Sequence, residues 1–458
     1  MFVSIIQFFY PDIKKEEILK FSLFAFALFL ILGSYWTLRI LKDALIYARI
    51  AFPTSLGWDS DYGRRLIPTL KLATPFVVTI MVIIYTKLLD MFDKHKLFYI
   101  FCSFYSLLFG IAAITLYIKD AFGAEHIGKY PLAALGVILY LMIESFGSLI
   151  VALFWSFAIS STKSEEAKRS FPFILAVAQI GTIGGSVMTL TGLASWKLFM
   201  MCAITIALVM VAIHKIITTI PAHQLVSDKL EKKHKPDMMA GVRLLLTQPY
   251  LLGVFVLSTF YEIVKAITDY QMKGQLCLIP GMDFMVMNGW FSFWTNVLAF
   301  LMALLGTSYI MKKYGLRFCA LFYPVIFAIA SSSLYIYYLS NPSPENLYWA
   351  TFYVMVIVTA TSYAVNNPTK EMMYIPTSSD AKFKVKSITD AIGSRGSKAI
   401  GSNIGGSLNV VGDATASIAN LMAFGTLIGL GFVGIWLVAA IYVGNKNAQL
   451  IRDNQIIE

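Results

Sequence analysis

Residues 368–407 read PTKEMMYIPTSSDAKFKVKSITDAIGSRGSKAIGSNIGGS. We expect a hydrophilic turn followed directly by a Gly/Ser-rich membrane helix that carries Arg395 and Lys398. Each of these two cations costs about 2.5–3.5 kcal/mol at the centre of a bilayer unless it meets water, protein or an anion. We interpret the helix as a wall of a water-filled, anion-receiving cavity, and the alternative is a tightly packed interior helix. The charged residues expected in the turn are Lys370, Glu371, Asp380, Lys382, Lys384 and Lys386.

The composition of the chain is that of an integral membrane protein. Of its 458 residues, 58% are hydrophobic and only 14% are charged, and the mean hydropathy is +0.70. This excludes a soluble domain. A helix needs about 20 apolar residues to cross a bilayer, and twelve stretches meet this requirement. They are residues 21–45, 66–89, 97–118, 131–160, 171–190, 197–217, 250–269, 288–310, 318–338, 347–365, 388–411 and 418–443.

The distribution of positive charge predicts the orientation of these spans. A net charge of +11 could indicate a nucleic-acid partner, but Lys and Arg are concentrated in alternate short loops, where they report topology instead. We therefore expect a multi-pass protein of the cell inner membrane, with both termini cytoplasmic, the lipid bilayer as its surroundings and no nucleic-acid partner. The first hydrophobic run starts at Phe21 without a small-residue cleavage site, so no removable signal peptide is expected.

The two halves of the chain resemble each other. The sequence IGGS occurs at residues 183–186 and again at residues 404–407, each time after a basic inner loop. Duplicated six-helix halves are typical of carriers that move about a site near the middle of the membrane. The sequence thus predicts an all-α membrane protein with two pseudo-symmetric halves, residues 1–217 and 244–458. Residues 218–243 are expected to form a charged cytoplasmic linker between them.

Several basic residues are predicted to lie inside the membrane. Arg39 and Lys42 share one face of the first helix, where they either bind phosphate or extend to the membrane surface. Acidic residues are few, and Glu144 is either part of the binding site or the buried partner of one cation. The surplus of positive charge favours a multiply negative solute. The other charged residues expected in the interior are Lys71, Glu262, Lys265, Asp269, Arg395 and Lys398.

The sequence offers little support for catalysis. Its five histidines do not have the spacing of metal ligands, and its four cysteines lie singly among apolar residues, so we expect neither a metal nor a cofactor. The segment from Gly393 to Lys398 lacks the four residues between glycines that a phosphate-binding loop requires. We therefore reject ATP hydrolysis as the driving force. A membrane-embedded transferase or phosphatase is the rival class, but its acids or histidines should cluster at one membrane surface.

The chain resembles a known family, the ATP:ADP antiporters or nucleotide transporters of intracellular bacteria and plastids. The resemblance covers both halves. It rests on Tyr35, Leu38, Arg39, Lys42 and Asp43 in the first span, on residues 144–148 (ESFGS) and 166–169 (EAKR), and on residues 370–376 (KEMMYIP) with residues 380–386 (DAKFKVK).

This resemblance implies a major-facilitator-like fold of twelve helices that exchanges ATP for ADP without hydrolysis. It further implies that transport depends on Lys42, Glu144, Glu262 and one of Lys384 or Lys386, while Gln179 matches an amide near the binding centre. We expect a monomer. A carrier of another nucleotide, of NAD or of another organic phosphate, including one coupled to protons, is the open alternative, because the chain departs from the family pattern at Trp36 and at Ile40.

Overall fold

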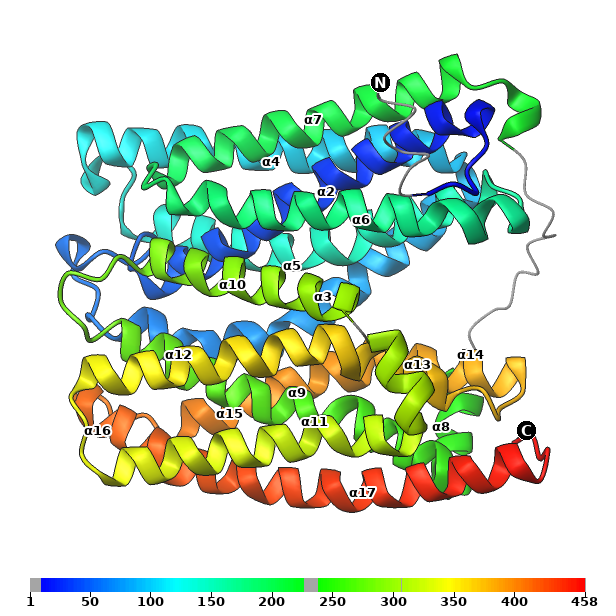
Figure 1. The fold of residues 1–458 in the computed structure, drawn as a ribbon. Coiled ribbons are helices and arrows are strands. Elements are labelled where there is room, and N and C mark those ends of the chain that lie inside the picture. Colours follow the sequence, from blue (N-terminus) through cyan, green and yellow to red (C-terminus); the bar gives the residue numbers. More distant parts are fainter. Residues whose placement is uncertain (1–9, 226–237, 306, 458) are drawn as a thin grey trace. The chain divides into compact units, whose positions relative to one another are not determined.

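The computed structural model describes residues 10–225, 238–305 and 307–457 (Figure 1). Within these ranges the chain is helical, and its β-structure is limited to isolated bridges between Thr377 and Ile457 and between Val410 and Asp413. The chain divides into two compact units. Unit 1 comprises Met1–Ser60, Phe76–Lys233 and Met285–Phe293, and unit 2 comprises Asp61–Pro75, His234–Phe284 and Trp294–Glu458.

Unit 1 is organised around its first long helix. This helix, α2, is buried along most of its length because its neighbours α5, α6 and α7 pack against different faces of it. Its sequence is apolar on nearly every side, as expected for a helix enclosed by others. The helices of unit 1 are α2 (Lys15–Tyr47), α4 (Lys94–Phe122), α5 (Lys129–Ser160), α6 (Ser164–Leu190), α7 (Ser195–Thr219) and most of α3 (Tyr62–Met91).

Two glycines on α6 allow its backbone to touch that of α2. A methyl group at Gly185 would lie 2.2 Å from the carbonyl oxygen of Gly33, and one at Gly181 would lie 2.5 Å from the carbonyl oxygen of Phe29. The hydroxyl of Thr37 donates to the carbonyl oxygen of Gly185 at 2.9 Å. The spacing of the two glycines is that of the small-xxx-small motif, which brings membrane helices into close contact.

Unit 2 repeats this contact between α9 and α15. A methyl group at Gly401 would lie 2.2 Å from the carbonyl oxygen of Ile263, and one at Gly405 would lie 2.8 Å from the ring of Tyr270. The two IGGS sequences contribute different glycines to these contacts, because Gly185 is the second glycine of the first IGGS and Gly405 is the first glycine of the other. What the two units share is a pair of glycines four residues apart on the helix that packs against the first long helix of the unit.

Unit 2 differs from unit 1 in that several of its helices are interrupted. Three π-helical turns occur in it: η4 (Ser362–Asn366), η5 (Thr389–Gly393) and η6 (Leu421–Gly425). The α-helices of unit 2 are α8 (Met238–Thr247), α9 (Pro249–Leu276), most of α10 (Phe284–Leu305), α11 (Thr307–Leu339), α12 (Pro344–Thr361), α13 (Asn367–Met373), α14 (Ser379–Ile388), α15 (Ser394–Ser407), α16 (Ala414–Asn420) and α17 (Thr426–Arg452).

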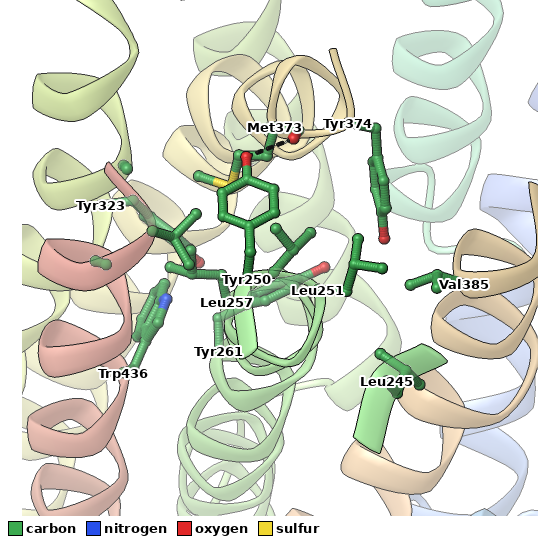
Figure 2. Packing of buried hydrophobic residues seen from close by; sticks show 14 of the residues in the cluster. Leu245, Tyr250, Leu251, Leu257, Tyr261, Tyr323, Met373, Tyr374, Val385 and Trp436 are labelled. Carbon is green, nitrogen blue, oxygen red and sulfur yellow. Dashed lines mark hydrogen bonds between the residues drawn. The ribbon is translucent and has the colours of Figure 1, made fainter. Parts of the chain in front are cut away.

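Large aromatic side chains fill the core of unit 2 (Figure 2). The indole of Trp436 packs edge-on against Tyr323, with ring centroids 5.1 Å apart, and Tyr261 lies beside both. The hydroxyl of Tyr250 donates to the carbonyl oxygen of Met373 at 2.7 Å and so joins α9 to the end of α13. This core fixes the part of α9 from which the charged residues of unit 2 project.

Eleven helices of the described residues are long and apolar enough to cross a membrane. They correspond to eleven of the predicted spans, and most of them extend a few residues further; the predicted span 288–310 instead runs too far, because α10 ends at Leu305 and α11 begins at Thr307. The remaining span, residues 388–411, is formed by η5 and α15, which are helical but rich in glycine and serine. The predicted lysine-rich turn is wrong. Its residues lie on helices α13 and α14, and only residues 374–378 connect these helices.

The predicted linker is only partly described. Residues 226–237 lie outside the described residues, and α8 begins at Met238. This helix packs closely on α14, because a methyl group at Gly241 would lie 2.9 Å from the carbonyl oxygen of Lys384. The end of the linker is therefore a helix of unit 2.

Candidate functional site

Unit 1 contains a buried lysine between two carboxylates. Lys42 near the end of α2 is only 5% exposed, and its Nζ lies 2.7 Å from Oδ1 of Asp43 and 3.2 Å from Oε1 of Glu144 on α5. The ring of Tyr140, one turn before Glu144, lies 4.4 Å from the same ammonium. A buried ammonium is costly without such partners, so the three charged groups form one interacting set.

Arg39 lies one turn before Lys42 and is half-buried. Its guanidinium lies 4.9 Å from the ring of Trp36, a cation–π contact. Tyr35 fits against α5 because Gly147 has no side chain, and a methyl group there would lie 2.2 Å from the tyrosine ring. The motif residues of the first and fourth spans are thereby brought together.

Unit 2 contains a second buried carboxylate, Glu262 on α9, which is 7% exposed. Its Oε1 accepts a hydrogen bond from the hydroxyl of Tyr261 at 2.7 Å and one from Ser394 at 3.3 Å, and it lies 3.5 Å from Nζ of Lys398 on α15. Lys370 on α13 donates to the Tyr261 hydroxyl at 3.2 Å.

Two further lysines act on this carboxylate. Lys265, one turn along α9, lies 5.1 Å from the ring of Tyr363 in the π-turn η4, and both Lys265 and Lys370 interact electrostatically with Glu262. Three lysines from α9, α13 and α15 therefore converge on one carboxylate. Such an arrangement attracts anions, because lysine binds phosphate as a point charge.

The ion pairs of the two units have opposite orientation. In unit 1 the lysine is on the first long helix and the glutamate is on a partner helix, α5. In unit 2 the glutamate is on the first long helix and the lysine is on a partner helix, α15. Each unit thus has a Lys–Glu pair in which the residue on the first long helix is buried, Lys42 in unit 1 and Glu262 in unit 2, with the charges exchanged.

The remaining predicted residues lie elsewhere. Lys71 lies in the part of α3 that belongs to unit 2, where its Nζ is 3.6 Å from Asp269, roughly 10 Å further along α9 than Glu262. Gln179 is exposed on α6, and its Oε1 accepts a hydrogen bond from Thr182 at 3.0 Å. Lys386 binds Glu371 at 2.5 and 2.7 Å.

Lys384 and Arg395 are both half-buried in unit 2. Lys384 lies on α14, one turn before η5. Arg395 at the start of α15 interacts electrostatically with Asp390 of η5, as does Lys386. Lys384 and Arg395 thus lie on the elements that flank η5, and Arg395 is on the same helix as Lys398.

A comparison with protein families identifies the family of the chain that carries these charged residues. The family model of the TLC ATP/ADP transporter matches residues 1–135 and 134–446, which is nearly the whole chain. The chain belongs to the TLC ATP/ADP transporter family.

Relatives of this family member cover almost its full length. The chain is 27% identical to ADP,ATP carrier protein 1 of Chlamydia pneumoniae, over 95% of this chain and 92% of that protein. It is also 27% identical to ADP,ATP carrier protein 2, chloroplastic, of Arabidopsis thaliana, over 93% of this chain and 74% of that protein.

Solved transporters share the fold of this family member. A D-xylose–proton symporter superposes with a TM-score of 0.64 at 13% identity, covering 93% of this chain and 97% of that protein. A mutant of the nucleoside transporter NupG superposes with a TM-score of 0.61 at 14% identity, covering 93% of this chain and 99% of that protein. The prediction of a major-facilitator-like fold of twelve helices in two halves is confirmed.

Sequence reasoning missed three residues of the cluster around Glu262 in this family member. Lys370 was expected in a turn, Ser394 was included only as part of the Gly/Ser-rich helix, and Tyr261 was not considered. One signal was available for Tyr261, because a tyrosine directly before a buried glutamate can donate to it. Lys370 lies within the motif at residues 370–376, but its distance of 109 positions from Tyr261 concealed the contact.

Proposed function

We propose that this chain exchanges ATP for ADP across a membrane by alternating access and hydrolyses neither. The observation that carries the proposal is the convergence of Lys265, Lys370 and Lys398 on the single carboxylate of Glu262. A chain of the TLC ATP/ADP transporter family needs such a site for a polyanion. The relatives named ADP,ATP carrier protein support the same substrates.

The Lys42–Glu144 and Lys398–Glu262 pairs suggest how exchange becomes obligatory. When no substrate is bound, Glu144 pairs with Lys42 and Glu262 pairs with Lys398. A bound phosphate competes with the glutamate for the paired lysine. The free energy of the conformational change therefore differs between the carrier with substrate and the carrier without it. The residues we propose for substrate binding or coupling are Arg39, Lys42, Lys71, Glu144, Gln179, Glu262, Lys265, Lys384, Lys386, Arg395 and Lys398.

The setting of this exchange is also a proposal. We place the chain in a cell inner membrane as a monomer, with both termini cytoplasmic, because basic residues are concentrated in alternate loops. Exchange of ATP for ADP moves about one net charge. A membrane potential of 100 mV then biases it by roughly 2.3 kcal/mol.

The experiment is uptake of labelled ATP into liposomes that contain the purified chain. Internal ADP should accelerate ATP uptake at least several-fold over empty liposomes. If internal ADP has no effect, the chain does not exchange the two nucleotides. Unlabelled NAD or another nucleotide that competes with ATP uptake where ADP does not would show that the chain carries that compound. A proton gradient that stimulates uptake where internal ADP does not would show proton-coupled transport.

A further inference from the structure

The charged groups around Lys42 in unit 1 are already balanced. The ammonium of Lys42 lies within 3.2 Å of two carboxylates, those of Asp43 and Glu144. With Arg39 included, the set has two basic and two acidic side chains. A phosphate approaching Lys42 therefore meets two negative charges, and it must displace one of them before it can bind.

The charged groups around Glu262 in unit 2 are not balanced. The charge of Lys386 is neutralised by Glu371, because its Nζ donates to both carboxylate oxygens of that residue. The rest of the set, linked by electrostatic interactions, has twice as many basic as acidic side chains. We call these six residues the Glu262 cluster: Glu262, Lys265, Lys370, Asp390, Arg395 and Lys398.

Lys370 of this cluster is held by a hydrogen bond to a neutral group. Its Nζ donates to the neutral phenol oxygen of Tyr261 at 3.2 Å and lies 4.6 Å from the centre of that ring. Among the described residues, no carboxylate lies within ion-pair distance of it. The Tyr261 hydroxyl donates its hydrogen bond to Oε1 of Glu262 at 2.7 Å, and its oxygen accepts the hydrogen bond from Lys370. The phenol thus orients the ammonium without neutralising it.

We propose that the Glu262 cluster binds the polyphosphate of the nucleotide and that Lys370 is one of its phosphate ligands. This inference deepens the proposed function and rests on it. Two excess positive charges match a polyphosphate, which carries several negative charges on adjacent oxygens. Lys370 binds phosphate directly, and Tyr261 is a positioning residue that holds its ammonium.

The test compares substrates that differ only in their number of phosphates. ATP, ADP, AMP and adenosine compete for uptake of labelled ATP into liposomes that contain the full chain or its Lys370→Ala variant. Loss of one charge-assisted contact should raise the inhibition constants of ATP and ADP by about 10- to 100-fold. The inhibition constant of adenosine, which has no phosphate, should stay within about 2-fold of its value for the wild type.

Two variants serve as controls. Lys446→Ala removes a half-buried lysine of α17 that, among the described residues, hydrogen-bonds Gln449 and no acidic side chain, and it should behave as the wild type. Tyr261→Phe keeps the ring under Lys370 but removes the oxygen that orients its ammonium. It should raise the constants for ATP and ADP less than Lys370→Ala does, and again leave adenosine unchanged. If Lys370→Ala does not reach the membrane, Lys370→Gln gives the same comparison.

Each outcome bears on the inference. Equal constants for Lys370→Ala and Lys446→Ala, with transport intact, overturn the role of Lys370 but leave nucleotide exchange standing. A parallel loss for ATP, ADP and adenosine also overturns it, because the defect is then structural. If the wild type transports no nucleotide, the proposed function itself fails.

Discussion

Replacing Lys42 by methionine should destabilise the protein more than removing the whole ion pair. The substitution leaves the carboxylate of Asp43, whose side chain is 7% exposed, without its ammonium at 2.7 Å. Removing one partner of a buried pair costs about 3–5 kcal/mol. The second carboxylate, Glu144, is 32% exposed and partly solvated, so we expect the lower end of this range, about 3 kcal/mol.

The assay is a double-mutant cycle of Lys42→Met, Asp43→Asn and the double variant, read as unfolding midpoints of the purified protein in detergent. The double variant should be more stable than Lys42→Met, with a coupling of about 1–3 kcal/mol between the two sites. Both variants without Lys42 should lose ATP uptake, since Glu144 then has no partner to exchange with substrate. Equal midpoints for Lys42→Met and the wild type would refute the reasoning.

The other predictions concern backbone contacts. Gly185→Ala should abolish accumulation of folded protein, because its methyl group has no space against α2. Gly184→Ala should be neutral, because its methyl group would meet no atom within 4 Å. The yield of membrane protein measures both effects. Gly401→Ala and Gly396→Ala should differ in the same way on α15, and equal yields would contradict the packing described. Ile457→Pro removes the N–H that donates to the carbonyl oxygen of Pro376 at 3.0 Å, so it should slow transport and expose the connection between α13 and α14 to proteases. Ile457→Ala keeps that N–H and should do neither.

Much of the fold could be predicted from the sequence. Long apolar runs indicate membrane helices because the bilayer excludes unpaired backbone groups, and eleven of the twelve predicted spans are apolar helices. The repeated IGGS was also informative, because the glycines before and within it at 181 and 185, and at 401 and 405, are needed for helix contact. Lys42 and Glu144 were singled out as candidate site residues because a charged side chain inside a membrane span is energetically costly and is typical of a functional site.

The helices of residues 367–388 could not be predicted in the same way. The segment has a proline, Pro368, as its second residue and is rich in charge, which is typical of a turn. In the structure Pro368 occupies the first turn of α13, where its missing N–H is tolerated, and η4 joins that helix to α12. The contact of Lys370 with Tyr261 depends on this tertiary arrangement, and no local pattern contains it.

The π-turn η5 has a consequence for the register of α15. A π-turn contains one residue more than the α-helical turn it replaces, and each residue of an α-helix advances the chain by about 100° around its axis. Deleting one residue of Thr389–Gly393 would remove this extra residue and straighten the segment, so Ser394 and Lys398 would keep their direction toward Glu262. A single-codon deletion between Ser394 and Lys398 has no extra residue to remove, so it would act as a rotational shift of about 100° between these two contacts of Glu262.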